Sequence, residues 1–362
     1  MQLGEEQTGH EKSATTAMTS PGTNRRWLLA NRPAGGVSVD NFQWTESSIP
    51  SPGEGQALVR NLWLSLDPTQ ILFTSESMGQ FAIPIGGVMR SLAAGRIVES
   101  KVSGFATGDL VQGFFGWEDY SITGAGPSPM PDDLPLLKLP TYVSPEVAIG
   151  TLGVTGMAAY FGTMDIARAK SGETFVVSSA SGGVGSVAGQ IAKIHGLRVI
   201  GVTGGKEKRD RLIEELQFDG AIDRNSEDVG SRLDALCPEG VDIFFDTNSL
   251  PSVINAVLKR LRHLGRVVLC GATPYYLSKE RPNEYVNYTA LIMKRGRMEG
   301  LLAREYFDRF SEAQATLAGW IKSGRLKPVL DTVVGLENAP LALQRVFTGA
   351  NFGKQLLEIS ES

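Results

Sequence analysis

The sequence predicts an α/β protein that combines a doubly wound parallel sheet domain with a β-rich domain shaped as a partly open barrel. Three observations predict this fold class. Apolar strand-like runs alternate with helical patterns between residues 176 and 270. A turn of small residues, Ser181-Gly182-Gly183-Val184-Gly185, joins the first of these strands to the first helix. Residues 25–140 instead hold short strand-like runs separated by Gly and Pro, as in an all-β unit.

The β-rich domain is expected to comprise residues 25–148 and 325–362. Residues 1–24 are polar and Ser/Thr-rich, so we expect a disordered tail without the apolar region of a signal peptide. A lone strand at 354–359 cannot be stable by itself, so it is expected to rejoin the β-rich domain. The strands expected in the first segment are 27–30, 42–46, 57–66, 94–98, 110–115 and 120–122.

The parallel sheet domain is expected to cover residues 149–324. After a Pro/Leu linker at 134–140, Ser144-Pro145 begins a helix that is expected to run through Phe161. The helix after the glycine turn has one apolar face and ends before Gly196, a suitable cap. The later elements expected in this domain are strands at 198–203, 221–223, 241–245 and 266–270, and helices at 205–217, 226–236, 252–261 and 304–322. Beyond it, a strand near 333–334 and a helix at 339–347 are expected in the C-terminal segment.

The glycine turn predicts a binding site for a dinucleotide. The backbone N–H groups at a helix N-terminus attract an anion. Gly182 lets the backbone approach a pyrophosphate, and Gly185 lets the helix pack close to the strand. Ala180 occupies the position where the usual fingerprint has its first glycine. Glycine-rich turns also arise for steric reasons alone, so the prediction depends on the strand–helix–strand unit around this one.

The residues after the second strand predict which dinucleotide is bound. NAD enzymes, and commonly methyltransferases, carry an acidic residue there for the ribose hydroxyls. This chain has Thr203-Gly204-Gly205, followed by four cations between 206 and 211. Small residues with nearby cations accept a 2′-phosphate that a carboxylate would repel. The sequence therefore predicts NADP(H), with Lys208 as the first phosphate ligand and Arg224 as the second, while the remaining cations fit a solvated helix face.

The composition argues against several classes of function. The 362 residues are 42% hydrophobic and 20% charged, as in an ordinary globular protein. A net charge of −4, without basic runs interleaved with aromatics, argues against nucleic-acid binding. The sequence has no run of about 18 apolar residues, so no membrane span is predicted.

The few cysteines and histidines limit metal and nucleophile chemistry. Cys237 and Cys270 lie in separate expected elements, which fits reduced thiols and a cytoplasmic location. Together with His10, His195 and His263 they cannot plausibly supply a tetrahedral zinc site, so no metal is expected. A Gly-x-Ser-x-Gly elbow paired with a suitable histidine is also missing, which disfavours a serine hydrolase.

Short motifs in a fixed order carry a family resemblance over residues 25–360. The chain resembles the zinc-independent medium-chain dehydrogenases/reductases, and within them the prostaglandin/leukotriene reductases and the alkenal and curcumin double-bond reductases. The resemblance implies a Rossmann-type nucleotide domain and a GroES-like catalytic domain. The matching motifs lie at 26–30 (RWLLA), 64–68 (LSLDP), 87–90 (GVMR), 153–157 (GVTGM), 159–162 (AYFG), 182–185 (GGVG), 207–208 (EK), 270–272 (CGA), 287–288 (NY) and 351–354 (NFGK).

The resemblance implies a role for individual residues. Residues 182–185 would hold the pyrophosphate, and Lys208 would bind the 2′-phosphate. Tyr276 stands at the spacing of the family's active-site tyrosine, with Tyr275 adjacent if the register differs by one. The complete set of cofactor-binding residues that we predict is Thr155, Met157, Ala180, Gly182, Gly183, Val184, Gly185, Thr203, Gly204, Lys208, Arg224, Asn248, Cys270, Gly271, Ala272, Asn351 and Gly353.

The chain departs from the family pattern at three places. Thr69-Gln70-Ile71 follows Asp67-Pro68 where the family commonly continues with Tyr-Met-Arg, so a pocket tyrosine and an arginine are missing. Residues 246–249 read Asp-Thr-Asn-Ser rather than Asp-Asn-Val-Gly. Arg224 replaces a tyrosine often found beside the 2′-phosphate. We therefore expect a retained cofactor site and an altered substrate pocket.

The activity that the resemblance implies is NADPH-dependent reduction of the carbon–carbon double bond of α,β-unsaturated aldehydes and ketones, by a homodimer acting on a small apolar enone or enal. Hydride would reach the β-carbon while Tyr276 or a cofactor ribose hydroxyl stabilises the enolate. Two alternatives stay open. One is a quinone reductase on the same scaffold, and the other is a cofactor-binding protein without catalysis, which the missing pocket tyrosine favours.

Overall fold

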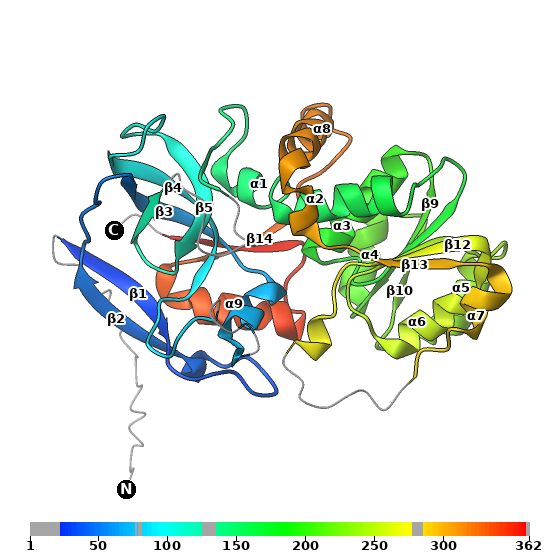
Figure 1. Cartoon of the computed structure of the whole chain (residues 1–362). Coiled ribbons are helices and arrows are strands. Elements are labelled where there is room, and N and C mark those ends of the chain that lie inside the picture. The colour runs from blue at the N-terminus through cyan, green and yellow to red at the C-terminus, as the bar shows by residue number, and fades with distance from the viewer. Residues whose placement is uncertain (1–21, 77, 79–81, 125–134, 277–284, 360–362) are drawn as a thin grey trace, which may run out of the picture.

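The computed structural model describes residues 22–76, 78, 82–124, 135–276 and 285–359, which form two lobes side by side (Figure 1). One lobe holds most of the strands from the first third of the chain, together with the C-terminal strands. The other lobe is the α/β domain formed by the middle of the chain. The two-domain α/β fold class predicted from the sequence is therefore confirmed.

A six-stranded parallel sheet forms the centre of the α/β domain, with the order β10-β9-β8-β11-β12-β13. The order reverses between β8 and β11, and ligands of such sheets bind at the carboxyl ends of the strands beside this point. The strands are β8 (Thr174–Val177), β9 (Arg198–Thr203), β10 (Gly220–Asp223), β11 (Val241–Asp246), β12 (Leu261–Leu269) and β13 (Arg297–Gly300).

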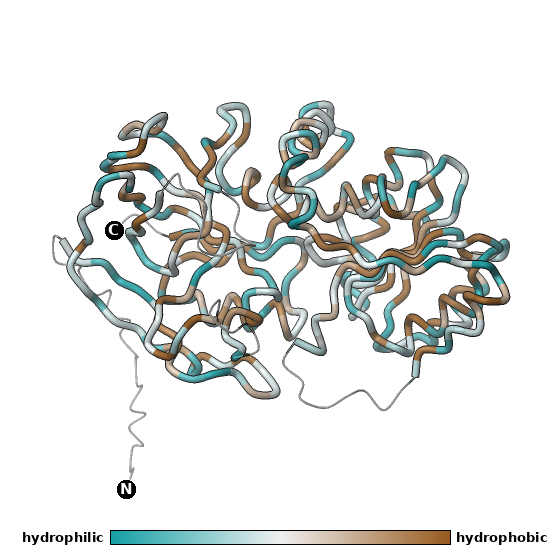
Figure 2. The backbone as a smooth tube through the Cα atoms, in the orientation of Figure 1, coloured by the Kyte–Doolittle hydropathy of each residue, from teal (hydrophilic) through white to brown (hydrophobic). Residues whose placement is uncertain are grey.

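Helices cover both faces of this sheet, because neighbouring side chains of a strand point to opposite faces. On β8, Phe175 and Val177 pack into one core cluster with helices α2, α3 and α8, while Val176 packs into a second cluster with α5 and α6. Figure 2 shows the strands of this lobe as mainly hydrophobic. The helices are α1 (Pro145–Ile149), α2 (Val154–Phe161), α3 (Gly183–Ile194), α4 (Lys206–Glu214), α5 (Val229–Leu236), α6 (Pro251–Leu258), α7 (Thr289–Lys294) and α8 (Phe310–Lys322).

The β-rich domain contains a seven-stranded sheet and a separate pair of strands. In the larger sheet the order is β14-β15-β3-β4-β5-β7, and β6 pairs with β3. The sheets are open, so the predicted partly open barrel is not closed. The strands are β1 (Thr23–Leu29), β2 (Phe42–Ser48), β3 (Gln56–Ser65), β4 (Arg90–Ser100), β5 (Leu110–Gly116), β6 (Tyr120–Gly124), β7 (Leu137–Lys138), β14 (Leu330–Val334) and β15 (Lys354–Glu358).

The C-terminal segment joins the two lobes. Strand β14 pairs parallel with β15, and β15 pairs antiparallel with β3, which confirms that the last strand rejoins the β-rich domain. Along the chain, helix α9 (Ala339–Thr348) follows β14 and precedes β15, and the loop after the helix runs along the α/β domain. An isolated bridge between Gly182 and Gly353 ties the start of β15 to the glycine turn.

Several predicted boundaries were wrong. The helix expected from Ser144 through Phe161 is two helices, because Gly150 and Gly153, both poor helix formers, lie in the turn between α1 and α2. The predicted helix 304–322 begins as the 3₁₀ turn Ala303–Arg309 before α8. Strand β1 starts at Thr23, inside the expected tail, whose first 21 residues lie outside the described range. Strand β13 and helix α7 were not predicted.

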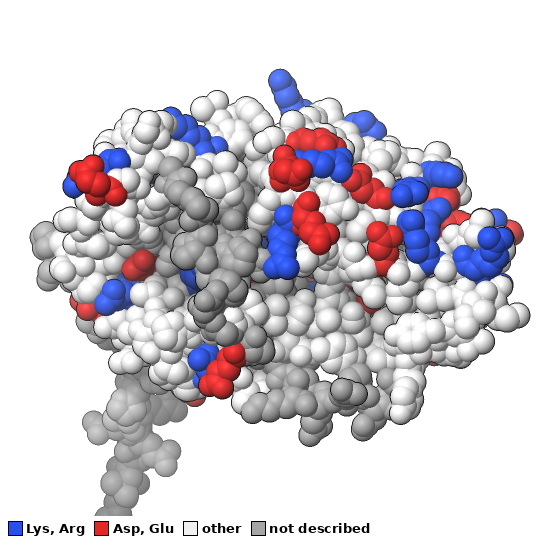
Figure 3. All heavy atoms as spheres, in the orientation of Figure 1, with Lys and Arg blue, Asp and Glu red and all other residues white. Residues whose placement is uncertain are grey.

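Charges are mixed over the surface. On the face in Figure 3, Lys and Arg lie among Asp and Glu across the α/β lobe, so no extended patch of one sign marks this face. No helix among the described residues is both long and apolar enough to cross a membrane.

Candidate functional site: a cleft between the domains

A cavity of about 650 Å³ lies where the two domains meet. Its walls come from the carboxyl ends of the parallel strands, from the turn after β3, and from α9 and the loop that follows it. Twelve of the predicted cofactor residues line it: Thr155, Gly182, Gly183, Val184, Gly185, Thr203, Gly204, Lys208, Arg224, Asn248, Asn351 and Gly353. The structure therefore places the residues predicted for the pyrophosphate and those predicted for the 2′-phosphate around the same cavity.

The glycine turn sets the N-terminus of α3 against the cavity. Gly182 is the N-cap of this helix, and its backbone N–H donates to the Ser179 carbonyl at 2.8 Å. A Cβ on Gly185 would lie 2.4 Å from that carbonyl oxygen, so only glycine lets the helix begin this close to the strand end. The exposed N–H groups at the start of α3 can then face a pyrophosphate.

Gly185→Ala is expected to weaken NADPH binding by about tenfold or more, since overpacking against backbone costs about 1–3 kcal/mol and 1.4 kcal/mol is tenfold in affinity. Titration of NADPH fluorescence measures the dissociation constant. Gly319→Ala on the exposed face of α8 is the matched control, because its added methyl meets nothing within 4 Å. Equal dissociation constants for Gly185→Ala and the wild type would show that the turn tolerates a side chain.

The opposite end of the cavity carries two cations. Lys208 on α4 and Arg224 after β10 both line it, beside Thr203 and Gly204. Burial lowers the pKa of Lys208, and the nearby positive charges of Arg224 and Arg345 lower it further, against the opposing effect of Asp331. An anion between Lys208 and Arg224 would relieve the repulsion between these two cations, so this end suits a phosphate.

Asp223, at the end of β10, contributes to the same end of the cavity indirectly. Its carboxylate accepts the Gly205 backbone N–H at 2.6 Å and the Asn225 backbone N–H at 3.0 Å. These bonds hold the turn after β9 and leave the carboxylate engaged with backbone. The end of β9, where NAD enzymes direct an acidic residue at the ribose hydroxyls, carries Thr203 and Gly204 instead.

An ion pair between a buried lysine and a partly exposed carboxylate forms part of the cavity wall near the glycine turn. The Lys354 ammonium group, only 4% exposed, donates to the Asp67 carboxylate and to the Leu66 carbonyl, both at 2.6 Å. Asp67 also accepts from the Ser65 hydroxyl at 2.7 Å. Asp67 and Lys354 lie in the sequence motifs at 64–68 and 351–354, but the sequence does not predict that the two side chains pair in the site.

Five predicted cofactor residues are not among the described residues that line the cavity. Met157 is buried in a cluster with Phe161 and Phe310. The Ala180 methyl packs beneath the turn, where Gly201 leaves room for it. The other three are Cys270, Gly271 and Ala272. Desolvation raises the pKa of the Cys270 thiol to about 12, so it stays protonated at neutral pH.

Tyr276 lies just beyond β12, at the end of a 3₁₀ turn. Its ring packs against the core of the β-rich domain, and its hydroxyl accepts the Ala272 backbone N–H at 3.2 Å. Burial raises the pKa of this phenol. Thr273 of the same turn lines the cavity, whereas Tyr276 is not among the described lining residues. Its catalytic role stays a prediction.

The cleft lies at the switch point of a doubly wound sheet, with a helix N-terminus on one side and two cations at one end. This arrangement is typical of proteins that bind a dinucleotide, among them dinucleotide-dependent oxidoreductases. Comparisons with known proteins agree with this class. A family profile described as the N-terminal domain of oxidoreductase matches residues 25–129, and one described as zinc-binding dehydrogenase matches residues 183–319. Among the residues that the structure describes, no group of three or more His, Cys, Asp or Glu could hold a metal ion.

Individual relatives are similar over nearly their whole length. The chain is 37% identical to the NADPH-dependent curcumin reductase of Escherichia coli (strain K12), covering 93% of this chain and 97% of that protein. It is 35% identical to the 2-alkenal reductase (NADP(+)-dependent) of Nicotiana tabacum, covering 93% and 98%. The crystal structure of CurA from Vibrio vulnificus in complex with NADPH matches with a TM-score of 0.85 at 33% identity, covering 93% and 100%. The chain therefore belongs to the zinc-independent medium-chain dehydrogenase/reductase family of NADP-dependent oxidoreductases.

Proposed function

We propose that this protein uses NADPH to reduce the carbon–carbon double bond of α,β-unsaturated aldehydes and ketones. The observation that carries the proposal is the Lys208–Arg224 end of the cavity, which suits a 2′-phosphate, in a chain of this family. Two relatives are named as a curcumin reductase and a 2-alkenal reductase. These names support a conjugated carbonyl compound as the substrate class here.

The residues of the cleft divide the work of holding the cofactor. The start of α3 would hold the pyrophosphate, and Lys208 with Arg224 would hold the 2′-phosphate, so both ends fix the dinucleotide. Bound NADPH supplies the hydride that reaches the β-carbon of the substrate. The electrons of the double bond move to the carbonyl oxygen, where a hydrogen-bond donor lowers the barrier. A proton from water or from a tyrosine then completes the saturated product at the α-carbon.

The test is turnover of purified protein with NADPH on a 2-alkenal, an aryl enone and a benzoquinone, followed as loss of absorbance of the reduced cofactor. We expect activity on the alkenal or the enone, and mass spectrometry of a saturated carbonyl product. NADPH deuterated on the transferred hydrogen should place the label on the β-carbon. Activity on the quinone alone would favour a quinone reductase, and tight NADPH binding without turnover would favour a protein that only binds the cofactor.

Lys208→Met is expected to raise the dissociation constant for NADPH by about 10- to 100-fold, because a hydrogen bond to a charged group is worth about 1.5–3 kcal/mol. The increase for NADH should be much smaller, since NADH lacks the 2′-phosphate. Fluorescence titration with both cofactors measures the two constants. Lys206→Met, on the exposed side of the same helix in an ion pair with Asp210, is the control and should change neither. Equal losses for the two cofactors would contradict the phosphate role.

Two further features are proposed from the family resemblance alone. A homodimer is one of them, and light scattering of the purified protein would reveal it as twice the mass of the 38.9 kDa chain. A cytoplasmic location is the other, and fluorescence microscopy of a tagged protein would test it.

A further inference from the structure

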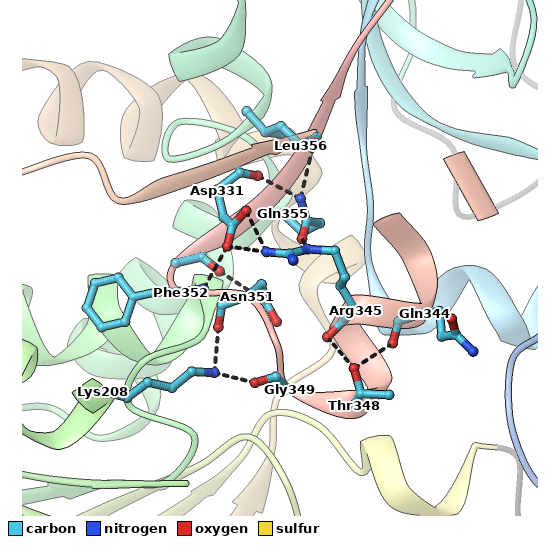
Figure 4. A network of polar contacts seen from close by, with 11 residues as sticks. Lys208, Asp331, Gln344, Arg345, Thr348, Gly349, Asn351, Phe352, Gln355 and Leu356 are labelled. Atoms are coloured by element: carbon cyan, nitrogen blue, oxygen red, sulfur yellow. Dashed lines mark hydrogen bonds and ion pairs between the residues drawn. The ribbon is translucent and has the colours of Figure 1, made fainter. Parts of the chain in front are cut away.

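The loop between α9 and β15, residues 349–353, forms one wall of the cofactor cavity and is fastened to both domains (Figure 4). On its own side, the Phe352 backbone N–H donates to the Asp331 carboxylate at 3.0 Å, and Arg345 pairs with that carboxylate at 2.9 Å. The Gly353 backbone N–H crosses to the Ser181 carbonyl of the glycine turn at 2.7 Å. The loop is thus the strap that joins the β-rich domain to the nucleotide-binding turn.

The side chain of Phe352 anchors the strap in the α/β domain. It is 7% exposed and belongs to the same buried cluster as residues of α2, α3 and α8. The guanidinium group of Arg211 on α4 lies 3.6 Å from the centre of its ring. An arginine over an aromatic face is attracted to the ring electrons. Helix α4, which carries the predicted phosphate ligand, therefore also holds the strap.

Lys208 supplies a second attachment from α4. Its ammonium group donates to the carbonyl oxygens of Gly349 and Asn351, the latter at 2.6 Å (Figure 4). An ammonium group has three N–H donors, so two are used by the strap and one is left for a further acceptor. Because Lys208 lines the cavity, that acceptor can be a bound phosphate.

We propose that Lys208 is a positioning residue for the strap as well as a ligand of the 2′-phosphate, so that the phosphate tightens the strap over the bound cofactor. A phosphate bound to the third N–H holds the Lys208 side chain in the conformation in which it also binds the two carbonyls. The conformational entropy of this side chain is then lost only once for the three hydrogen bonds, so phosphate binding strengthens the contact with the strap. NADPH is then favoured over NADH in turnover as well as in affinity. This inference rests on the proposed use of NADPH.

The first test needs no cofactor. Amide hydrogen exchange of the peptide containing residues 349–353 is measured in the wild type, in Lys208→Met and in the control Lys206→Met. We expect exchange to be about tenfold faster in Lys208→Met and unchanged in the control. The reason is that the variant loses hydrogen bonds that stabilise the strap against local opening. Should Lys208→Met fail to fold, Lys208→Gln supplies the same comparison. Unchanged exchange in a folded Lys208 variant would overturn the proposal.

The second test separates the phosphate from the rest of the nucleotide. Saturating adenosine 2′,5′-bisphosphate should slow exchange of the strap several-fold more than saturating 5′-AMP in the wild type, and this difference should vanish in Lys208→Met. Equal slowing by the two nucleotides would overturn the coupling while leaving NADPH binding intact. Failure of the bisphosphate to bind in calorimetry would instead overturn the NADPH assignment, and the coupling with it.

Kinetics with NADH provide a third readout. Lys206→Met, on the exposed side of α4, is the control and should leave kcat with NADH unchanged. Lys208→Met should lower kcat with saturating NADH several-fold, because the strap is loosened even without a 2′-phosphate. The same kcat with NADH in both variants would show that Lys208 acts on the phosphate alone.

Discussion

Asp67→Ala is expected to lower the free energy of unfolding by about 3–5 kcal/mol, because it leaves the buried Lys354 ammonium group without its counter-charge. The side chain of Lys354 is 4% exposed and that of Asp67, which lines the cavity, is 31% exposed, so water entering at the truncated position would offset only part of the lost carboxylate. The other acceptor of the Lys354 hydrogen bonds is the Leu66 carbonyl at 2.6 Å. Burial already lowers the pKa of Lys354, with Asp67 opposing this effect, so the variant would favour the neutral amine more strongly.

Urea unfolding followed by fluorescence measures the loss. Glu54→Ala, which removes an exposed carboxylate from the same domain, is the control and should stay within about 0.5 kcal/mol of the wild type. The double variant Asp67→Leu/Lys354→Met should recover much of the stability, since apolar pairs can replace buried ion pairs with little loss. A loss of less than about 1 kcal/mol for Asp67→Ala, as for an exposed pair, would show that solvent reaches Lys354.

The location of this pair explains why it also bears on function. Lys354 follows Gly353, whose backbone N–H bonds to the glycine turn, and a Cβ on Gly183 would lie 3.2 Å from the Lys354 side chain. The ion pair therefore fixes the start of β15 against the residues that would hold the pyrophosphate. We expect stability and NADPH affinity to fall together in Asp67→Ala.

The sequence predicted the arrangement of the fold well where periodic patterns are strong. Strands such as Val241–Asp246 are apolar runs bounded by turn residues, and they form as expected. Strand β13 was missed because its four residues, Arg297–Gly300, include two charged side chains and lie at the edge of the sheet. The division of α1 from α2 has a local cause in the poor helix propensity of Gly150 and Gly153, and a distant one that the sequence does not reveal, since a Cβ on Gly150 would meet Leu330.

The candidate site was predictable where local backbone geometry defines it. The glycine turn and Lys208 could be identified because their chemistry follows from neighbours in the sequence. Lys354 could not, because lysine is ordinarily exposed and its partner lies 287 positions away. The two carbonyls that Lys208 binds belong to residues more than 140 positions later in the chain, so the second use of this lysine follows only from the tertiary structure.

Tyr276→Phe is expected to lower kcat by about 10²- to 10³-fold if the phenol stabilises the enolate oxygen, the magnitude found when one such donor is removed. In the structure the Tyr276 hydroxyl accepts the Ala272 backbone N–H, which leaves its own proton available to donate. Burial raises the pKa of Tyr276, so the donor stays protonated through neutral pH. As the pH rises, ionisation of Tyr276 should therefore not lower the kcat of the wild type below about pH 10.

Single-turnover measurement of NADPH oxidation separates the chemical step from product release, and fluorescence titration checks that the dissociation constant for NADPH is unchanged. Tyr275→Phe on the same turn is the matched control and also tests a register that differs by one. A large loss in Tyr275→Phe alone would transfer the role to that neighbour. A rate within about twofold of the wild type for both variants would exclude a tyrosine donor here, since removal of a donor of this kind costs at least about 10²-fold. A cofactor ribose hydroxyl would then be the candidate donor that is left.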